Sequence, residues 1–437
     1  MKKKNNLGTS TRRSFIKTTG TAALGSTLAF NIIISKTVYA GNSDTIKVGL
    51  IGCGGRGTGA ASQALNADDN VVLTAMADIF EDKLKSSLKN LKKELDKKVK
   101  VDEDHQFLGF DSYNKLLASD VDMVILATPP AFRPDHLAAA VEARKHIFCE
   151  KPMAVDAPGF RKVLESVQKA KDKKLSLVSG FCWRHDFPKQ EAFKRVLDGE
   201  IGEVRSIYNT YNTGELWSKP MEKGWSEMEY KMRNWLYYNW LSGDHIVEQA
   251  IHSVDMMSWA MGDEILPVSC TGTGGRQQRT EEKFGHIYDH FAITYEYENG
   301  AKGFHMSRQQ KFCDRSYAVD MNGTKGRAIV DCIKRIHRVE NGETWNYRGE
   351  TNNMYQTEHD VLFASIRKGD AVNEGVRMAN STMLGIMGRM AAYTGKTVTW
   401  EDAIKSTEVL GPKIDEYSWE LEWPTTPVAV PGVTKFF

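Results

Sequence analysis

Four side chains have types and spacings that suit proton transfer. Lys151 stands in the run Glu150-Lys151-Pro152, directly after an apolar segment. Glu248, His252 and Asp255 follow at intervals of four and three residues, which would place them on one face of a helix. A carboxylate beside an imidazole orients the ring and raises its basicity, as a general base for an alcohol requires. Spacing alone favours a surface ion contact over a catalytic pair, and an acid–His pair without a third ligand makes no metal site.

A glycine-rich run precedes these residues and suits a phosphate ligand. Gly52-Cys53-Gly54-Gly55-Arg56-Gly57 follows an apolar strand and opens a helix, the setting that a G-x-G-x-x-G motif requires. The first glycine of the motif allows a tight turn, and the second lets a pyrophosphate approach the backbone closely. The third lets the helix and the strand pack closely together. Free N–H groups at the helix start would bind the phosphates. We therefore expect a dinucleotide site at Gly52, Gly54, Gly55, Arg56 and Gly57, completed by Asp78.

Asp78 bears on which dinucleotide is bound. It ends the second predicted strand, twenty-one residues after Gly57. A carboxylate there accepts hydrogen bonds from ribose hydroxyls and repels a 2′-phosphate, which favours NAD over NADP. Arg56 favours NADP instead, because its positive charge attracts the 2′-phosphate.

The order of elements predicts an α/β fold for the first half. Short apolar strands, such as 46–51, 71–77 and 121–127, alternate with segments of helical pattern. Strands separated by helices of ten or more residues indicate βαβ units and a doubly wound parallel sheet. Glu150 and Lys151 follow such a strand, so they would lie at the ligand-binding edge of this sheet.

The pattern changes after about residue 180. The segment 244–261 reads as one helix, and beyond residue 268 successive strands are joined by tight turns at 298–300 and 323–325. These features predict an α+β domain with an open, mainly antiparallel sheet. We divide the chain into 1–40, 41–180 and 181–437, and expect the last helix, 375–393, to pack back on the first domain.

Composition and the N-terminal segment limit the function classes. The 437 residues carry a net charge of +2, which gives no reason to expect nucleic acid as a partner. No Cys/His set has zinc spacing, so we expect no metal.

The run Thr11-Arg12-Arg13-Ser14-Phe15-Ile16-Lys17 resembles a twin-arginine signal. Residues 1–40 are therefore expected to be a removed signal peptide, with export to the periplasm and no membrane attachment after processing.

Taken in order, these motifs resemble the glucose–fructose oxidoreductase/inositol dehydrogenase/MocA (Gfo/Idh/MocA) family. The glycine run, Asp78, Thr128-Pro129-Pro130, Glu150-Lys151-Pro152 and the 243–255 helix carry the likeness. It covers nearly the whole chain after the signal segment. The resemblance implies a Rossmann NAD(P)-binding domain followed by a substrate domain, and it adds Thr128, Pro129, Glu150 and Lys151 to the expected cofactor site.

The resemblance also implies roles for individual residues. Lys151 and His252 would carry proton transfer, and Glu248, where the family commonly has Asp, would bind substrate or orient His252. Arg184 and His185 resemble the family's strand-end substrate contacts. Asp255 and Tyr288 are further candidates to face the substrate.

We expect an NAD(P)-dependent oxidoreductase acting on a sugar or polyol hydroxyl. An exported enzyme meets little free cofactor, so its NAD would be tightly bound and recycled between two half-reactions. The alternative is a redox-neutral glycoside hydrolase. Such an enzyme oxidises its substrate, eliminates the leaving group, adds water and then returns the hydride. A non-catalytic cofactor-binding sensor is a third possibility. The open sheet would form a homo-oligomer, because exposed antiparallel sheets readily associate.

Overall fold

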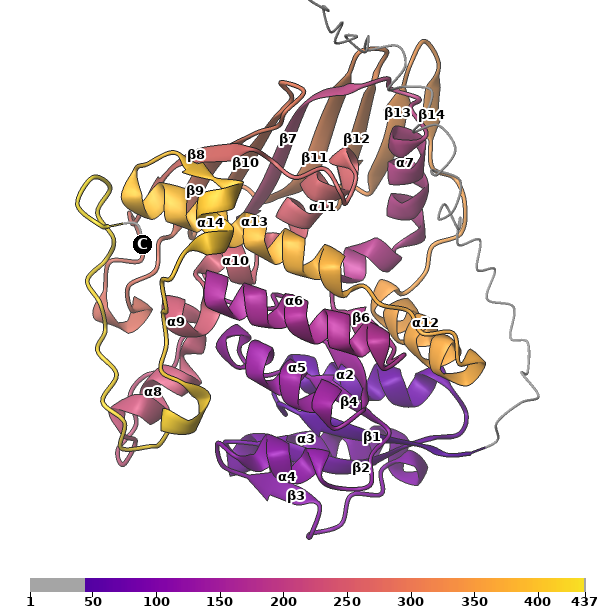
Figure 1. Ribbon diagram of the computed structural model, residues 1–437, viewed down its shortest axis with the longest axis vertical. Coiled ribbons are helices and arrows are strands. Elements are labelled where there is room, and N and C mark those ends of the chain that lie inside the picture. The colour runs from indigo at the N-terminus through magenta and orange to yellow at the C-terminus, as the bar shows by residue number, and fades with distance from the viewer. Residues whose placement is uncertain (1–43, 436–437) are drawn as a thin grey trace, which may run out of the picture. The chain divides into compact units, whose positions relative to one another are not determined.

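The computed structural model describes residues 44–435 and begins with a six-stranded parallel sheet (Figure 1). Its strand order is β3-β2-β1-β4-β5-β6. The strands are β1 (Ile46–Ile51), β2 (Val71–Asp78), β3 (Gln106–Leu108), β4 (Met123–Leu126), β5 (His146–Cys149) and β6 (Leu177–Ser179). Since the order reverses beside β1, the carboxyl ends of β1 and β4 border a crevice of the kind that binds ligands.

Helices cover both faces of this sheet because its strands are apolar on both sides. Ile51 and Leu126 pack in one core cluster, whereas Leu50 and Ile125, one residue earlier on the same strands, pack in a second. The helices of this region are α2 (Gly55–Ala67), α3 (Glu81–Leu95), α4 (Ser112–Leu117), α5 (Arg133–Glu142) and α6 (Ala157–Asp172). The α/β prediction is thus confirmed for the first half.

A nine-stranded, mainly antiparallel sheet forms the second half, in the order β14-β13-β12-β11-β7-β10-β9-β8-β15. Its strands are β7 (Val204–Thr213), β8 (Ser269–Gly275), β9 (His290–Glu296), β10 (Lys302–Gln309), β11 (Ser316–Gly323), β12 (Arg327–Asp331), β13 (Ile336–Glu340), β14 (Thr344–Asn346) and β15 (Val398–Thr399). Among the strands described for this sheet, only β7 and β10 pair in parallel. Both predicted hairpin turns occur, between β9 and β10 and between β11 and β12.

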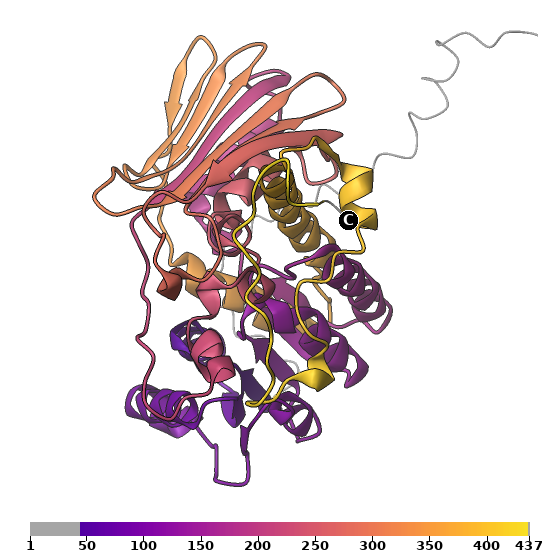
Figure 2. The same cartoon turned by 90° about the vertical axis from the view of Figure 1, so that its left-hand side faces the viewer.

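Helices lie on one face of this second sheet, and its other face is open among the described residues (Figure 2). The remaining helices are α7 (Phe187–Leu197), α8 (Glu227–Arg233), α9 (Asn239–Ser242), α10 (His245–Glu248), α11 (Ile251–Met261), α12 (Met354–Lys368), α13 (Gly375–Thr394) and α14 (Trp400–Lys405). Within residues 44–435, no helix is long and apolar enough to cross a membrane.

The chain returns to the first sheet after the second is complete. Helix α12 packs against α2, and α13 packs against both α6 and β8. Consequently α13 joins the two sheets, and the glycine loop ahead of α2 lies near residues from the second half.

Candidate functional site

The glycine loop has the shape of a phosphate cradle. Gly52 has a φ of +97°, and a Cβ atom at Gly57 would lie 1.9 Å from the Gly52 carbonyl oxygen. Helix α2 starts at Gly55, and no side chain caps it at Gly54. A Cβ atom at either of these two glycines would meet no atom within 4 Å, so their backbone faces open space. The loop therefore fits a pyrophosphate bound to N–H groups at a helix start.

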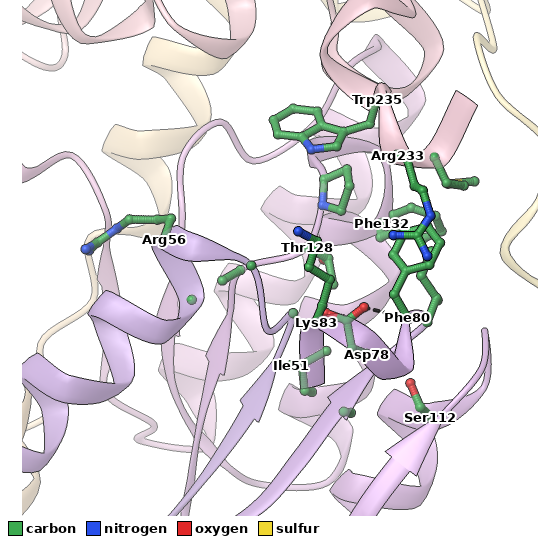
Figure 3. Close-up of a pocket in the computed structure, with 18 of the residues that line it drawn as sticks. Ile51, Arg56, Asp78, Phe80, Lys83, Ser112, Thr128, Phe132, Arg233 and Trp235 are labelled. Atoms are coloured by element: carbon green, nitrogen blue, oxygen red, sulfur yellow. Dashed lines mark hydrogen bonds between the residues drawn. The ribbon is translucent and has the colours of Figure 1, made fainter. Parts of the chain in front are cut away.

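A cavity of about 480 Å³ begins at this loop. Figure 3 shows Asp78, Lys83 and Thr128 grouped around it, and Pro129 also lines it. Asp78 Oδ2 accepts a hydrogen bond from Cys53 N at 2.6 Å, and Oδ1 accepts one from Phe80 N at 2.8 Å. Burial raises the pKa of Asp78 above its usual value. Each carboxylate oxygen has a second lone pair, so Asp78 can still accept from a ribose hydroxyl.

Arg56 borders the cavity, but its guanidinium turns away from Asp78 (Figure 3). It pairs with Glu150 and, at 2.7 Å, with Glu358. Both carboxylates are almost completely buried. The charge of Arg56 is therefore balanced by these two acids. This pairing removes the support for the prediction that Arg56 binds a 2′-phosphate.

Arg133 fixes the two loops that carry the motif residues beyond β4 and β5. Its buried guanidinium donates to the carbonyl oxygen of Pro152 at 2.6 Å and to that of Thr128 at 2.7 Å. Sequence reasoning did not identify Arg133, because an arginine in the first turn of a helix carries no motif. Its effect is to hold Lys151 at a set position relative to Thr128.

Lys151 contacts Glu248 rather than solvent. Its ammonium group donates to the Glu248 carbonyl oxygen at 2.6 Å and to Glu248 Oε1 at 3.1 Å. Both side chains are 13% exposed. An ammonium group has three protons, so one donor remains for a substrate oxygen.

The structure corrects the predicted helix that carries Glu248 and His252. Helix α10 ends at Glu248 and α11 begins at Ile251, so the two side chains do not share a continuous helical face. The expected Glu248–His252 contact is absent among the described hydrogen bonds, and Glu248 is paired with Lys151 instead. The proposal that Glu248 orients His252 is therefore wrong.

His252 is held by aromatic rings and has the properties of a neutral base. Its ring centroid lies 5.1 Å from that of Trp183 and 6.1 Å from that of Phe181. Nδ1 is buried without a hydrogen-bond partner in the described structure. Burial, followed by the charges of Lys151 and Arg56, holds the pKa of His252 well below its usual value. The ring is thus uncharged near neutral pH and able to accept a proton.

Arg184 and Asp255 form a buried ion pair, which corrects their expected role as substrate contacts. Arg184 Nε and Nη2 donate to the two Asp255 carboxylate oxygens at 2.8 and 2.9 Å. Both side chains are only 2% exposed, and Arg184 also reaches Asp263 at 2.7 Å. The pair joins the segment after β6 to helix α11.

This assignment predicts a stability effect. We expect Arg184→Met to lower the free energy of unfolding by about 3–5 kcal/mol, because it leaves a buried carboxylate unpaired. Urea unfolding followed by tryptophan fluorescence measures this. Lys405→Met, which breaks the exposed Lys405–Glu401 pair, is the matched control and should change little. An Arg184→Met enzyme with unchanged stability and a raised KM would instead restore the substrate-contact role.

His185 and Tyr288 both lie in largely buried surroundings. His185 Nε2 lies 3.4 Å from Glu374, and both side chains are largely buried. The Tyr288 hydroxyl donates to the Ala429 carbonyl oxygen at 2.8 Å, and the residue is 1% exposed. Tyr288 is therefore not available to a substrate, which corrects that prediction. His185 Nε2 has no hydrogen-bond partner among the described residues, so the proposed role of His185 stays a prediction.

Residues from the second half complete the cavity, which sequence motifs did not indicate. Trp217, Lys219, Met232, Arg233 and Trp235 lie between β7 and α9 and line the cavity together with the glycine loop. The only signal for them was the abundance of aromatic residues after Tyr208. That signal is equally typical of core packing, so it could not locate a site.

The C-terminal segment packs behind the same cavity wall. The Trp419 ring centroid lies 5.5 Å from Phe80 and 4.8 Å from Phe110, and that of Tyr417 lies 4.8 Å from Phe132. All three phenylalanines line the cavity. The cavity wall is therefore built from three separate parts of the chain.

Comparison with protein-family models divides the chain as the two sheets do. Residues 46–178 match the GFO_IDH_MocA model, described as an oxidoreductase family with an NAD-binding Rossmann fold. Residues 190–329 match the model of the GFO/IDH/MocA C-terminal domain.

Curated relatives and solved structures agree with this division. The chain is 26% identical over 330 residues to a 2,7-anhydro-N-acetylneuraminate hydratase from Escherichia coli, covering 75% of this chain and 77% of the relative. It is 22% identical over 380 residues to a myo-inositol 2-dehydrogenase from Thermotoga maritima, covering 84% and 100%.

Among solved structures, the aldose-aldose oxidoreductase from Caulobacter crescentus superimposes with a TM-score of 0.64 at 20% identity, covering 81% of this chain and 99% of that one. The KijD10 3-ketoreductase from Actinomadura kijaniata, solved with NADP, gives 0.61 at 17% identity, covering 80% and 98%. These likenesses establish the fold.

Proposed function

Because the chain belongs to the Gfo/Idh/MocA family of NAD-binding oxidoreductases, we propose that it oxidises a hydroxyl group of a sugar or polyol with a resident NAD. The observation that carries this proposal is the convergence of Lys151, Glu248 and His252 beside the strand ends that border the glycine loop. When bound, the nicotinamide cofactor supplies the acceptor for a hydride and can later return it. Gly52, Gly54, Gly57 and Asp78 would hold its phosphates and ribose.

The chain's own residues handle the proton and the orientation of the substrate. His252 is uncharged, and its Nδ1 is enclosed, so Nε2 takes the proton of the substrate hydroxyl. Lys151 holds the same hydroxyl oxygen through its remaining N–H donor and stabilises the negative charge that develops there. Glu248 keeps the ammonium group in place through both its carbonyl and its carboxylate.

A carbohydrate or polyol is the proposed substrate class. The inositol dehydrogenase and the aldose-aldose oxidoreductase named above are relatives with such substrates. Trp183, which is 9% exposed, places an apolar ring beside His252, as a site for a sugar ring would require.

Retention of the cofactor is supported by the construction of the cavity. Trp217 and Trp235 from the second half line the cavity opposite Asp78, and Trp419 packs behind Phe80. We propose that contacts from both halves of the chain slow the release of a bound dinucleotide. NAD is preferred to NADP in this proposal, because Asp78 lies in the cavity and Arg56 is paired with two acids.

Export and self-association complete the proposal. The twin-arginine motif lies outside the described residues, and we propose on its sequence alone that the chain is exported to the periplasm with NAD already bound. We further propose that two copies associate through the open face of the second sheet, where Tyr208 is 48% exposed.

Nucleotide analysis of the purified protein tests the proposal. Denaturation is expected to release about one NAD per chain, and incubation with a panel of sugars and polyols should convert the bound nucleotide to NADH. A second sugar carbonyl should then reoxidise it. Protein without bound nucleotide that also fails to bind added NAD(H) or NADP(H) would overturn the proposal.

A redox-neutral hydrolase or lyase is the second candidate, favoured by the likeness to a hydratase. It uses the same base and cofactor, with the hydride returned to the same substrate. Cleavage of an aryl glycoside without added NAD and without net NADH would support it. Net oxidation of a free sugar without cleavage supports the oxidoreductase.

A further inference from the structure

Two lysines from distant parts of the chain meet at the cofactor cavity. Lys83 lies in the first turn of α3, and Lys219 lies between β7 and α8. Both line the cavity of about 480 Å³. Lys83 also borders a neighbouring hollow together with Gly54 and Gly55. The Lys83 side chain therefore lies beside the glycine loop and borders the same space as the loop backbone.

Neither ammonium group has a carboxylate as a direct partner among the described residues. Arg233, which lines the same cavity, pairs with Asp82 at 3.0 Å and with Glu229 at 2.8 Å. Lys83 and Lys219 form no ion pair within residues 44–435. Burial lowers the pKa of Lys219, and the nearby charges of Lys83 and Arg233 lower it further. The Asp82 carboxylate attracts both lysines, but it is paired with Arg233 and forms no ion pair with either of them. A bound anion would give the two ammonium groups a direct partner and relieve their mutual repulsion.

The position of Lys219 is fixed by its backbone. Its N–H donates to Asn234 Oδ1 at 2.8 Å, and Asn234 Nδ2 donates to its carbonyl oxygen at 3.2 Å. Asn234 is completely buried. Since a buried amide holds both backbone groups of Lys219, its side chain leaves from a defined point on the cavity wall.

We propose that Lys83 and Lys219 bind a phosphate of the dinucleotide, so that the second half of the chain holds the cofactor directly. This inference rests on the proposed function, in which the cavity contains NAD(P). The phosphate could belong to the pyrophosphate, which NAD and NADP share, or to the 2′-phosphate of NADP alone. We assign the pyrophosphate, because Lys83 lies beside Gly54 and Gly55. The glycine loop and the two lysines would then enclose it from opposite sides.

The test measures binding of NADH and of NADPH to the full chain freed of nucleotide, by energy transfer from tryptophan. Lys219→Met is expected to weaken NADH binding by about 10- to 100-fold, the loss typical of one charge-assisted hydrogen bond. It should also make binding less dependent on salt. Lys219→Arg should retain most of the affinity. Lys223→Met removes an exposed lysine of the same segment and should bind as the unaltered protein does.

Each outcome shows whether the lysine site, the pyrophosphate assignment or the proposed function is wrong. If Lys219→Met and Lys83→Met bind NADH as tightly as the unaltered protein, the inference is wrong. A loss confined to NADPH would overturn the pyrophosphate assignment and place the 2′-phosphate at the lysines. If the unaltered protein binds neither dinucleotide, the proposed function itself fails. Thermal unfolding of each nucleotide-free variant shows that it is folded, since removing one of two like charges should not destabilise it.

Discussion

Replacement of His252 by asparagine is expected to reduce the rate of substrate oxidation by about 10²- to 10⁴-fold, the contribution typical of a positioned general base. Asparagine retains polarity and approximate size at the start of α11, but it cannot accept a proton. Single-turnover conversion of the bound nucleotide to its reduced form measures the effect on chemistry. The nucleotide content after purification should stay near that of the unaltered protein, because His252 does not line the cofactor cavity.

The pH dependence provides a second test of His252. The base works only when it is unprotonated, so activity is lost as the pH falls through its pKa in the folded protein. Burial and the neighbouring positive charges lower this pKa well below its usual value. The acid limb of kcat/KM is therefore expected well below pH 6.5. A limb centred at or above that pH, or full activity in His252→Asn, would remove His252 from the role of base.

The first half of the fold was predictable because its signals are local. Each buried strand is a short apolar run, and the glycine motif lies between a strand and a helix, the setting in which it binds a pyrophosphate. Asp78 and Lys151 follow such strands directly, so topology alone places them at one edge of the sheet. The structure then brings Asp78 and the glycine loop to one cavity.

The break before His252 was not predictable, because the residues beside it bond to distant partners. The Glu248 carbonyl oxygen, at the end of α10, accepts a hydrogen bond from Lys151 Nζ at 2.6 Å. Gln249, which lies between α10 and α11, accepts one at Oε1 from Gln309 Nε2 at 2.5 Å. These partners lie 97 and 60 residues away in the sequence, so no helical pattern within 244–261 reports them.

Long-range pairing also explains the errors among the expected substrate contacts. Arg184 was a reasonable candidate because charged residues at strand ends often bind ligands. Its partner, Asp255, is 71 residues away, and the pair becomes buried only when α11 packs beside the segment after β6. The same limit applies to Lys219, which has no motif and reaches the cavity only through the fold.

Replacement of Lys151 by methionine is the other change expected to have a large effect, again about 10²- to 10⁴-fold on the chemical step. Methionine fills similar space, but it removes the donor proposed to hold the reacting hydroxyl and stabilise its charge. The change also leaves the 13%-exposed Glu248 carboxylate without its cation. Loss of activity in the single variant could therefore come either from lost catalysis or from a displaced Glu248.

The double variant Lys151→Met/Glu248→Gln separates these two causes. If Lys151 only balances Glu248, neutralising both should restore activity to that of Glu248→Gln alone. If Lys151 contacts the substrate, the double variant should remain as inactive as Lys151→Met. Removing the ammonium charge should also raise the pKa of His252, since Lys151 is the first neighbouring charge that lowers it after burial. The acid limb of the residual activity is thus expected to move to higher pH in Lys151→Met, and an unmoved limb would show that the two side chains do not act as one proton-handling unit.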